Sequence, residues 1–211
     1  TSRLIVQSGV HDRLVDMLVE RVRGLRLGDG RQAGTDVGPL IHEESLKKVE
    51  RYVQIGIEEG AQLAIGGKRA TGAALAKGNF FEPTIFTQVR PGSRLEQEEI
   101  FGPVLSVIKV ETADEAFAVN NDVKYGLSSS LYTRNVELAF RAMSELDNGI
   151  TYVNAPTIGA EAHLPFGGVK QTGNGHREGG WEVYEFYSET KVCYIDYSGA
   201  LQKAQIDTYT D

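Results

Sequence analysis

The segment 95–104 brings carboxylates, an aromatic ring and a Gly-Pro turn into one short run. Glu96, Glu98 and Glu99 stand directly before Phe101. A carboxylate can accept hydrogen bonds from the hydroxyls of a ribose, and a neighbouring aromatic ring can pack against a nicotinamide. The segment therefore suits a bound nucleotide. The alternative is a solvated acidic loop in which Phe101 is a core anchor, and spacing by itself does not decide between them.

The other reactive side chains give weaker signals. Cys193 lies in a β-rich run without a nearby helix start or an evident base, so it is predicted to be structural. The four histidines are scattered without ligand spacing, and no metal site is predicted. His163 is interpreted as a loop or core histidine rather than a proton shuttle. The glycines of 173–180 lack the spacing of a dinucleotide fingerprint and predict a flexible loop.

Composition limits the classes of function. The 211 residues are 41% hydrophobic, which is enough for a sizeable core. Lys and Arg total 22 against 29 for Asp and Glu, and the net charge of -7 disfavours nucleic acid and anionic membranes as partners. The apolar runs are far shorter than the roughly 20 residues that cross a bilayer. A single cysteine excludes an internal disulfide, so a cytoplasmic location is the default, unless an upstream segment carries a targeting signal.

Hydrophobic periodicity predicts alternating helices and strands. Helices are expected at 10–27, 43–60, 112–121 and 136–146. Strands are expected at 4–6, 61–65, 80–86, 104–110, 127–132 and 150–153, with further ordered runs at 181–187 and 191–197. Such alternation is typical of an α/β fold with a mostly parallel sheet flanked by helices.

One segment carries a family signature. The run Glu98–Val104 resembles the EEIFGPV signature of the NAD(P)-dependent aldehyde dehydrogenase superfamily. Further elements extend the resemblance over almost the whole chain: the GP turn at Gly38-Pro39, YGL at Tyr125-Gly126-Leu127, VN at Val153-Asn154 and PFGG-x-K at Pro165–Lys170. The resemblance implies the α/β catalytic domain of that superfamily, with a C-terminal oligomerisation strand.

The resemblance also implies a site for NAD or NADP. In the superfamily the second Glu of the signature holds the nicotinamide ribose and the Phe contacts the cofactor, which carries over to Glu99 and Phe101. Lys48 matches a lysine that can reach the adenosine end of the cofactor, and Phe166 matches a ring near the aldehyde tunnel. From the residues alone, Lys48 reads as a solvated helix lysine and Phe166 as a loop anchor.

Three segments are expected on the same grounds. Residues 1–180 would form a partial catalytic domain, 181–198 an oligomerisation segment and 199–211 a partly disordered tail. The run 189–195 resembles the pairing strand that adds to the sheet of a neighbouring subunit, so a homodimer or homotetramer is expected. The alternative is an ordinary edge strand within the same domain.

The implied activity is oxidation of an aldehyde to a carboxylic acid through a cysteine thioester. The superfamily's nucleophilic Cys and general-base Glu lie upstream of the position that matches Thr1, so no catalytic residue is assigned here and the chain alone is expected to be inactive. The loop 154–164 resembles members that oxidise semialdehydes bearing a carboxylate. Two alternatives stay open: a non-catalytic oligomerisation module, and a relative that releases the thioester to coenzyme A or phosphate.

Overall fold

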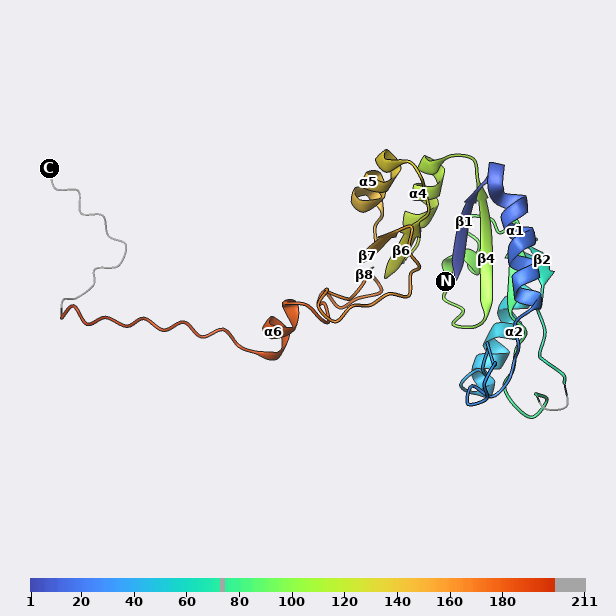
Figure 1. The fold of residues 1–211 in the computed structure, drawn as a ribbon, viewed down its shortest axis with the longest axis horizontal. Helices are drawn as coiled ribbons and strands as arrows, with labels where there is room; N and C mark the ends of the chain where they lie inside the picture. The colour runs from blue at the N-terminus through green and yellow to red at the C-terminus, as the bar shows by residue number, and fades with distance from the viewer. Residues whose placement is uncertain (73–74, 200–211) are drawn as a thin grey trace.

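A four-stranded sheet organises the first half of the chain (Figure 1). In the computed structural model, which describes residues 1–72 and 75–199, the strand order is β1-β4-β3-β2. The strands are β1 Arg3–Gln7, β2 Gln62–Ile65, β3 Thr84–Thr87 and β4 Val104–Val110. Both β1 and β3 run parallel to β4, whereas β2 is antiparallel to β3. The expected α/β fold with a mostly parallel sheet is confirmed.

Four helices accompany this sheet. They are α1 Ser8–Arg23, α2 Glu43–Glu58, α3 Arg94–Gln97 and α4 Ala113–Asn121. The ring of His42 caps α2 by accepting from the Ser45 N–H at 3.0 Å, and Thr112 caps α4 by accepting from the Glu115 N–H at 3.1 Å. Such caps satisfy backbone donors that have no partner inside the helix, which fixes where each helix begins.

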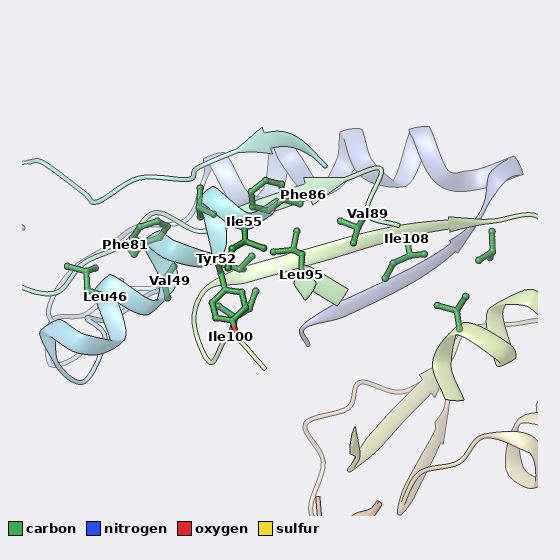
Figure 2. Packing of buried hydrophobic residues seen from close by; sticks show 14 residues of the cluster. Leu46, Val49, Tyr52, Ile55, Phe81, Phe86, Val89, Leu95, Ile100 and Ile108 are labelled. Atoms are coloured by element: carbon green, nitrogen blue, oxygen red, sulfur yellow. The ribbon is translucent and has the colours of Figure 1, made fainter. Parts of the chain in front are cut away.

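The central strand β4 divides the core into two layers. Val104, Ile108 and Val110 belong to the cluster that α2 and α4 cover, while Val107 belongs to the cluster that α1 covers. Successive side chains of a strand point to opposite faces, so this alternation buries β4 on both sides. Figure 2 shows α2 side chains, among them Val49, packing toward the sheet.

The second part of the chain is built from smaller pieces. Its elements are β5 Tyr125–Gly126, β6 Ser128–Leu131, α5 Val136–Glu145, β7 Ile150–Val153, β8 Val169–Lys170 and α6 Glu182–Tyr187. Strands β6 and β7 pair in parallel, and β5 and β8 pair antiparallel. Figure 1 shows α6 and the segment after it extending away from the rest of the molecule.

Several expected boundaries were wrong. The first helix ends at Arg23 rather than at 27, because the backbone closes a turn there with Gly24 as cap. The strand expected at 80–86 begins only at Thr84. Pro83 has no N–H to donate to a ladder, and Phe81 before it forms a single isolated bridge with Arg69.

The ordered run expected at 191–197, which overlaps the expected pairing strand 189–195, forms no strand within the described part of the chain. Residues 188–199 are exposed and take no strand partner within the described part of the chain. Residues 200–211 of the expected tail lie outside the described residues. Across residues 1–72 and 75–199, no helix has both the length and the apolar character that a bilayer crossing would need.

Candidate cofactor site

The signature run forms a loop between α3 and β4, pressed against α2. Ile100 is buried within the main core cluster, which anchors the middle of the loop. A Cβ atom on Gly102 would lie 2.3 Å from Cγ2 of Val49, so only glycine allows this close approach. Phe101 has a φ of 58°, a left-handed conformation that a bulky residue adopts at a cost of about 1–3 kcal/mol. The surrounding packing therefore fixes an unusual backbone turn here.

The three residues predicted to bind the cofactor meet at this loop. Lys48, on α2, donates from Nζ to the backbone oxygen of Glu99 at 2.7 Å. Glu99 is exposed, and its carboxylate has no partner among the described residues. The Phe101 ring is 80% exposed, so the alternative of a core anchor is wrong. The loop turns an acceptor and an aromatic face outward.

The carboxylate of Glu98, unlike that of Glu99, is held by hydrogen bonds within the chain. Its carboxylate accepts from the Tyr52 hydroxyl at 2.6 Å and from two nitrogens of Arg94 at 3.1 Å each. Hydrogen bonds from Arg94 and then Tyr52 lower the pKa of Glu98, whereas burial and the Glu98 charge raise the pKa of Tyr52. Glu98 is thus a fixed carboxylate, and the interpretation of a solvated acidic loop fails for it.

Glu96 is buried, with an exposed fraction of only 3%. Its partner is Arg3, which the sequence pattern did not reveal and which donates to Glu96 and also to the backbone oxygens of Val119 at 3.0 Å and Asn120 at 3.1 Å. The only hint of this ion pair in the sequence was a charged residue, Arg3, beside the apolar run of β1. The partner could not be identified because it lies far along the chain.

The loop after β7 begins at a fixed turn. Asn154 has a φ of 54°, accepts from the Thr133 N–H at 2.9 Å and donates to the Thr133 oxygen at 2.9 Å. Beyond it, the hydroxyls of Thr1 and Thr157 are hydrogen-bonded at 3.3 Å. His163, further along, is exposed. Thr1, two residues before β1, therefore touches the loop 154–164, whose sequence resembles that of semialdehyde-oxidising members.

Phe166 is not brought to the cluster around Lys48. It is partly buried, and its backbone pairs with Glu178 through bonds of 2.6 and 2.8 Å. Figure 1 shows the neighbouring strand β8 well separated from α2. The Lys170 side chain that follows donates to the Asn121 oxygen at 2.6 Å and pairs with Asp147 at 2.8 Å. That lysine fastens the PFGG-x-K loop to α4, a structural role that was not predicted.

Cys193 is a free, exposed thiol. Within the described residues, no group of three or more His, Cys, Asp and Glu side chains is arranged to hold a metal ion.

Comparison with known proteins decides the family. Residues 1–193 match the model of the aldehyde dehydrogenase family. The chain belongs to the aldehyde dehydrogenase family. It is 42% identical over 195 residues to the betaine aldehyde dehydrogenase of Bacillus subtilis, covering 92% of this chain and 39% of that protein. It is also 42% identical over 197 residues to the alpha-ketoglutarate semialdehyde dehydrogenase of Haloferax volcanii, covering 93% of this chain and 40% of that protein.

Solved structures of this family share the fold. The betaine aldehyde dehydrogenase of Staphylococcus aureus in complex with NAD+ superposes with a TM-score of 0.85 at 39% identity, over 88% of this chain and 37% of that one. The HpcC protein of Thermus thermophilus gives a TM-score of 0.86 at 39% identity, over 94% and 40% of the two chains. The chain thus spans about 40% of the length of the curated relatives it matches.

Proposed function

We propose that the protein containing this chain oxidises an aldehyde to a carboxylic acid with NAD or NADP. The observation that carries the proposal is the outward-facing pair Glu99 and Phe101 on a loop that Lys48 fixes to α2. The complex of the Staphylococcus aureus relative with NAD+ supports it, since that protein shares 39% identity with this chain.

The residues present fit a nicotinamide nucleotide. The unpartnered Glu99 carboxylate can accept from the two hydroxyls of a ribose, and the exposed Phe101 ring can lie against the nicotinamide. Lys48 has three N–H donors, of which the Glu99 carbonyl takes one, so the others stay available for an oxygen of the cofactor. The bound cofactor would supply the hydride acceptor for the oxidation.

We assign the nucleophile and the general base to parts of the protein outside this chain. A thioester mechanism needs a thiolate beside a group that can activate it. Cys193 is exposed on an extended segment, and no described residue bonds to its thiol. The chain by itself is therefore expected to be inactive, and Phe166 is assigned to the aldehyde side of the site.

For the substrate we propose a semialdehyde that bears a carboxylate. The Pro-Thr-x-Gly-Ala-Glu pattern at 156–161 and the named alpha-ketoglutarate semialdehyde relative support this choice. Betaine aldehyde, which carries a cation, is the natural competitor, because a relative named for it is equally similar. The two substrates have opposite charge, so a kinetic comparison separates them.

We also propose that residues 189–195 pair with the sheet of a second copy. Val192, Tyr194 and Ile195 are exposed in an extended segment whose backbone has no strand partner within the described residues. Adding such a segment to a sheet edge satisfies backbone groups and buries apolar side chains. Removal of residues 189–211 should convert a homodimer or homotetramer into a smaller species in analytical ultracentrifugation.

The test of the activity uses the full-length protein that contains this chain. NAD(P)H formation is followed with alpha-ketoglutarate semialdehyde, succinate semialdehyde and betaine aldehyde. Glu99→Gln and Phe101→Ala should raise the KM for the cofactor, while Glu20→Gln, an exposed carboxylate on α1, should leave it unchanged. Formation of an acyl-coenzyme A or acyl phosphate instead of the free acid would mean that the thioester is released by acyl transfer and not by hydrolysis. If no NAD(P)H forms with any of these aldehydes, the proposed oxidation is excluded, and the alternative of a non-catalytic oligomerisation module stands.

A further inference from the structure

The ion pair of the partly buried Arg3 and the buried Glu96 joins three elements of the molecule. Arg3 lies at the start of β1, Glu96 lies in α3, and the guanidinium also binds the backbone oxygens of Val119 and Asn120 near the end of α4. The second carboxylate oxygen of Glu96 accepts from the Gln97 side chain at 2.6 Å and the Gly92 N–H at 3.3 Å. Each charge is thus surrounded by hydrogen-bond partners, which makes the arrangement rigid.

Both ends of this pair lead directly to the proposed site. On one side, Thr1 stands two positions before Arg3 and bonds to Thr157 in the loop 154–164, which carries the pattern that we relate to the semialdehyde substrate. On the other side, α3 ends at Gln97 and passes into the loop that presents Glu99. The pair is therefore the side-chain connection between the start of β1 and the helix that leads to the cofactor loop.

We propose that Arg3 and Glu96 are positioning residues that set the distance between the start of β1 and the loop carrying Glu99 and Phe101. Among the described residues, the hydrogen bonds of both side chains go to groups other than Lys48, Glu99 and Phe101, so their effect is transmitted through the backbone of α3. The inference rests on the proposed function, because the loop needs a defined position only if a nucleotide binds there. A misplacement of about 1 Å can reduce catalysis by about a hundredfold.

The experiment compares conservative variants of the pair in the full-length protein. Glu96→Gln keeps the shape and an acceptor oxygen but removes the charge. Arg3→Lys keeps the charge but loses the fork that binds Glu96 and two carbonyl oxygens together. The matched control is Arg141→Gln, which removes an arginine that bonds to Asp114 and Glu145 across α4 and α5, away from the loop. Dissociation constants for NAD+ and NADP+ are measured by titration calorimetry, and KM values for the aldehyde by NAD(P)H formation.

A positioning role predicts a selective effect. The dissociation constant of the preferred cofactor should rise about tenfold to a hundredfold in Glu96→Gln and Arg3→Lys, while the KM for the aldehyde stays within about twofold. Arg141→Gln should lower the melting temperature and leave cofactor affinity unchanged. Should Glu96→Gln fail to fold, the milder Arg3→Lys variant carries the same comparison.

Two negative results are distinguishable. If the wild-type protein binds the cofactor and both pair variants bind it equally well, the positioning role is overturned and the proposed function stands. If the wild-type protein binds neither NAD+ nor NADP+, the proposed function fails and the inference fails with it.

Discussion

The two halves of this chain differ in how completely they bury their own side chains. All large hydrophobic residues that are buried in the described structure lie at or before Val123, around the four-stranded sheet. After that point the buried hydrophobic residues of the described part reduce to Ala142. The first half therefore contains its own core, while the second half contains folded elements without one.

The exposed apolar residues of the second half indicate what that half lacks. Large aromatic and aliphatic side chains are exposed on α5, on α6 and in the segment after it: Val136, Phe140, Met143, Trp181, Tyr184, Phe186, Tyr187, Val192, Tyr194, Ile195 and Tyr197. The second half thus leaves exposed the kinds of side chain that the first half buries in its core.

The largest difference between the halves should be seen by truncating one phenylalanine in each. Phe86 is fully buried in β3, so Phe86→Ala should lower the free energy of unfolding by about 3–5 kcal/mol. Phe140 on α5 is 66% exposed, and Phe140→Ala should change the free energy of unfolding by about 0.5 kcal/mol or less. Urea titration of the 211-residue chain followed by circular dichroism measures both. Equal losses would mean that the halves do not differ as described.

Two glycines of the first half test how tightly its backbone is packed. Gly66 has a φ of 79°, and a Cβ there would lie 2.3 Å from the oxygen of Pro83. Gly66→Ala should therefore cost about 2–4 kcal/mol, the sum of backbone strain and a clash with main-chain atoms. Gly92 has the same φ but open space around it, so Gly92→Ala should show the strain alone, about 1 kcal/mol. A Gly92 variant as unstable as the Gly66 variant would contradict this account.

The hydrogen bonds from Tyr52 and Arg94 to Glu98, in the first half, predict that the stability of the fold depends on pH. Because hydrogen bonds lower the pKa of folded Glu98 below its ordinary value of 4.5, its charge stabilises the fold above that pH. The stabilisation is lost as the pH falls through the lowered pKa. The melting temperature of the wild-type chain should exceed that of Glu98→Gln at pH 7, and the difference should shrink below pH 4.5. A constant difference from pH 7 to pH 3 would exclude this mechanism.

The smallest expected change in stability concerns the second half. Trp181→Ala removes a ring that is exposed beside Tyr184, so unfolding of the 211-residue chain should shift by about 0.5 kcal/mol or less. Self-association should weaken nevertheless, because aromatic residues dominate the binding energy of interfaces. Sedimentation velocity at several concentrations measures this. A large loss of stability without a change in association would show that the ring packs within its own chain.

Local chemistry made much of the first half predictable. Strand β4 was expected at the observed residues, and the start of α4 followed from its Thr112 cap. The resemblance related Lys48 to the adenosine end of the cofactor and Glu99 to the nicotinamide ribose, so the direct hydrogen bond between them was not foreseen. The cluster of Tyr52 and Arg94 on Glu98 was missed, although Arg94 and Glu98 are spaced to pair as helical neighbours.

Other features depend on contacts that no local pattern encodes. The Arg3–Glu96 pair joins residues distant in sequence, and nothing in either segment identifies the other. The run 191–197 shows the reverse case, because its residues have strand propensity but a strand forms only where a partner supplies the hydrogen bonds. The expected roles of Glu99, Phe101, Lys48 and Phe166 stay predictions that the variants above will test.

The sheet order has a consequence for the time course of folding. The two parallel neighbours of β4 are β1 and β3, and β4 follows both of them in the chain. Arg3 pairs with Ser106, so this contact closes a loop that contains α1, α2, β2 and β3. Long-range parallel pairing of this kind makes folding slow. A chain ending before Val104 would keep β1 and β3 but lack the strand between them, and its sheet could not assemble.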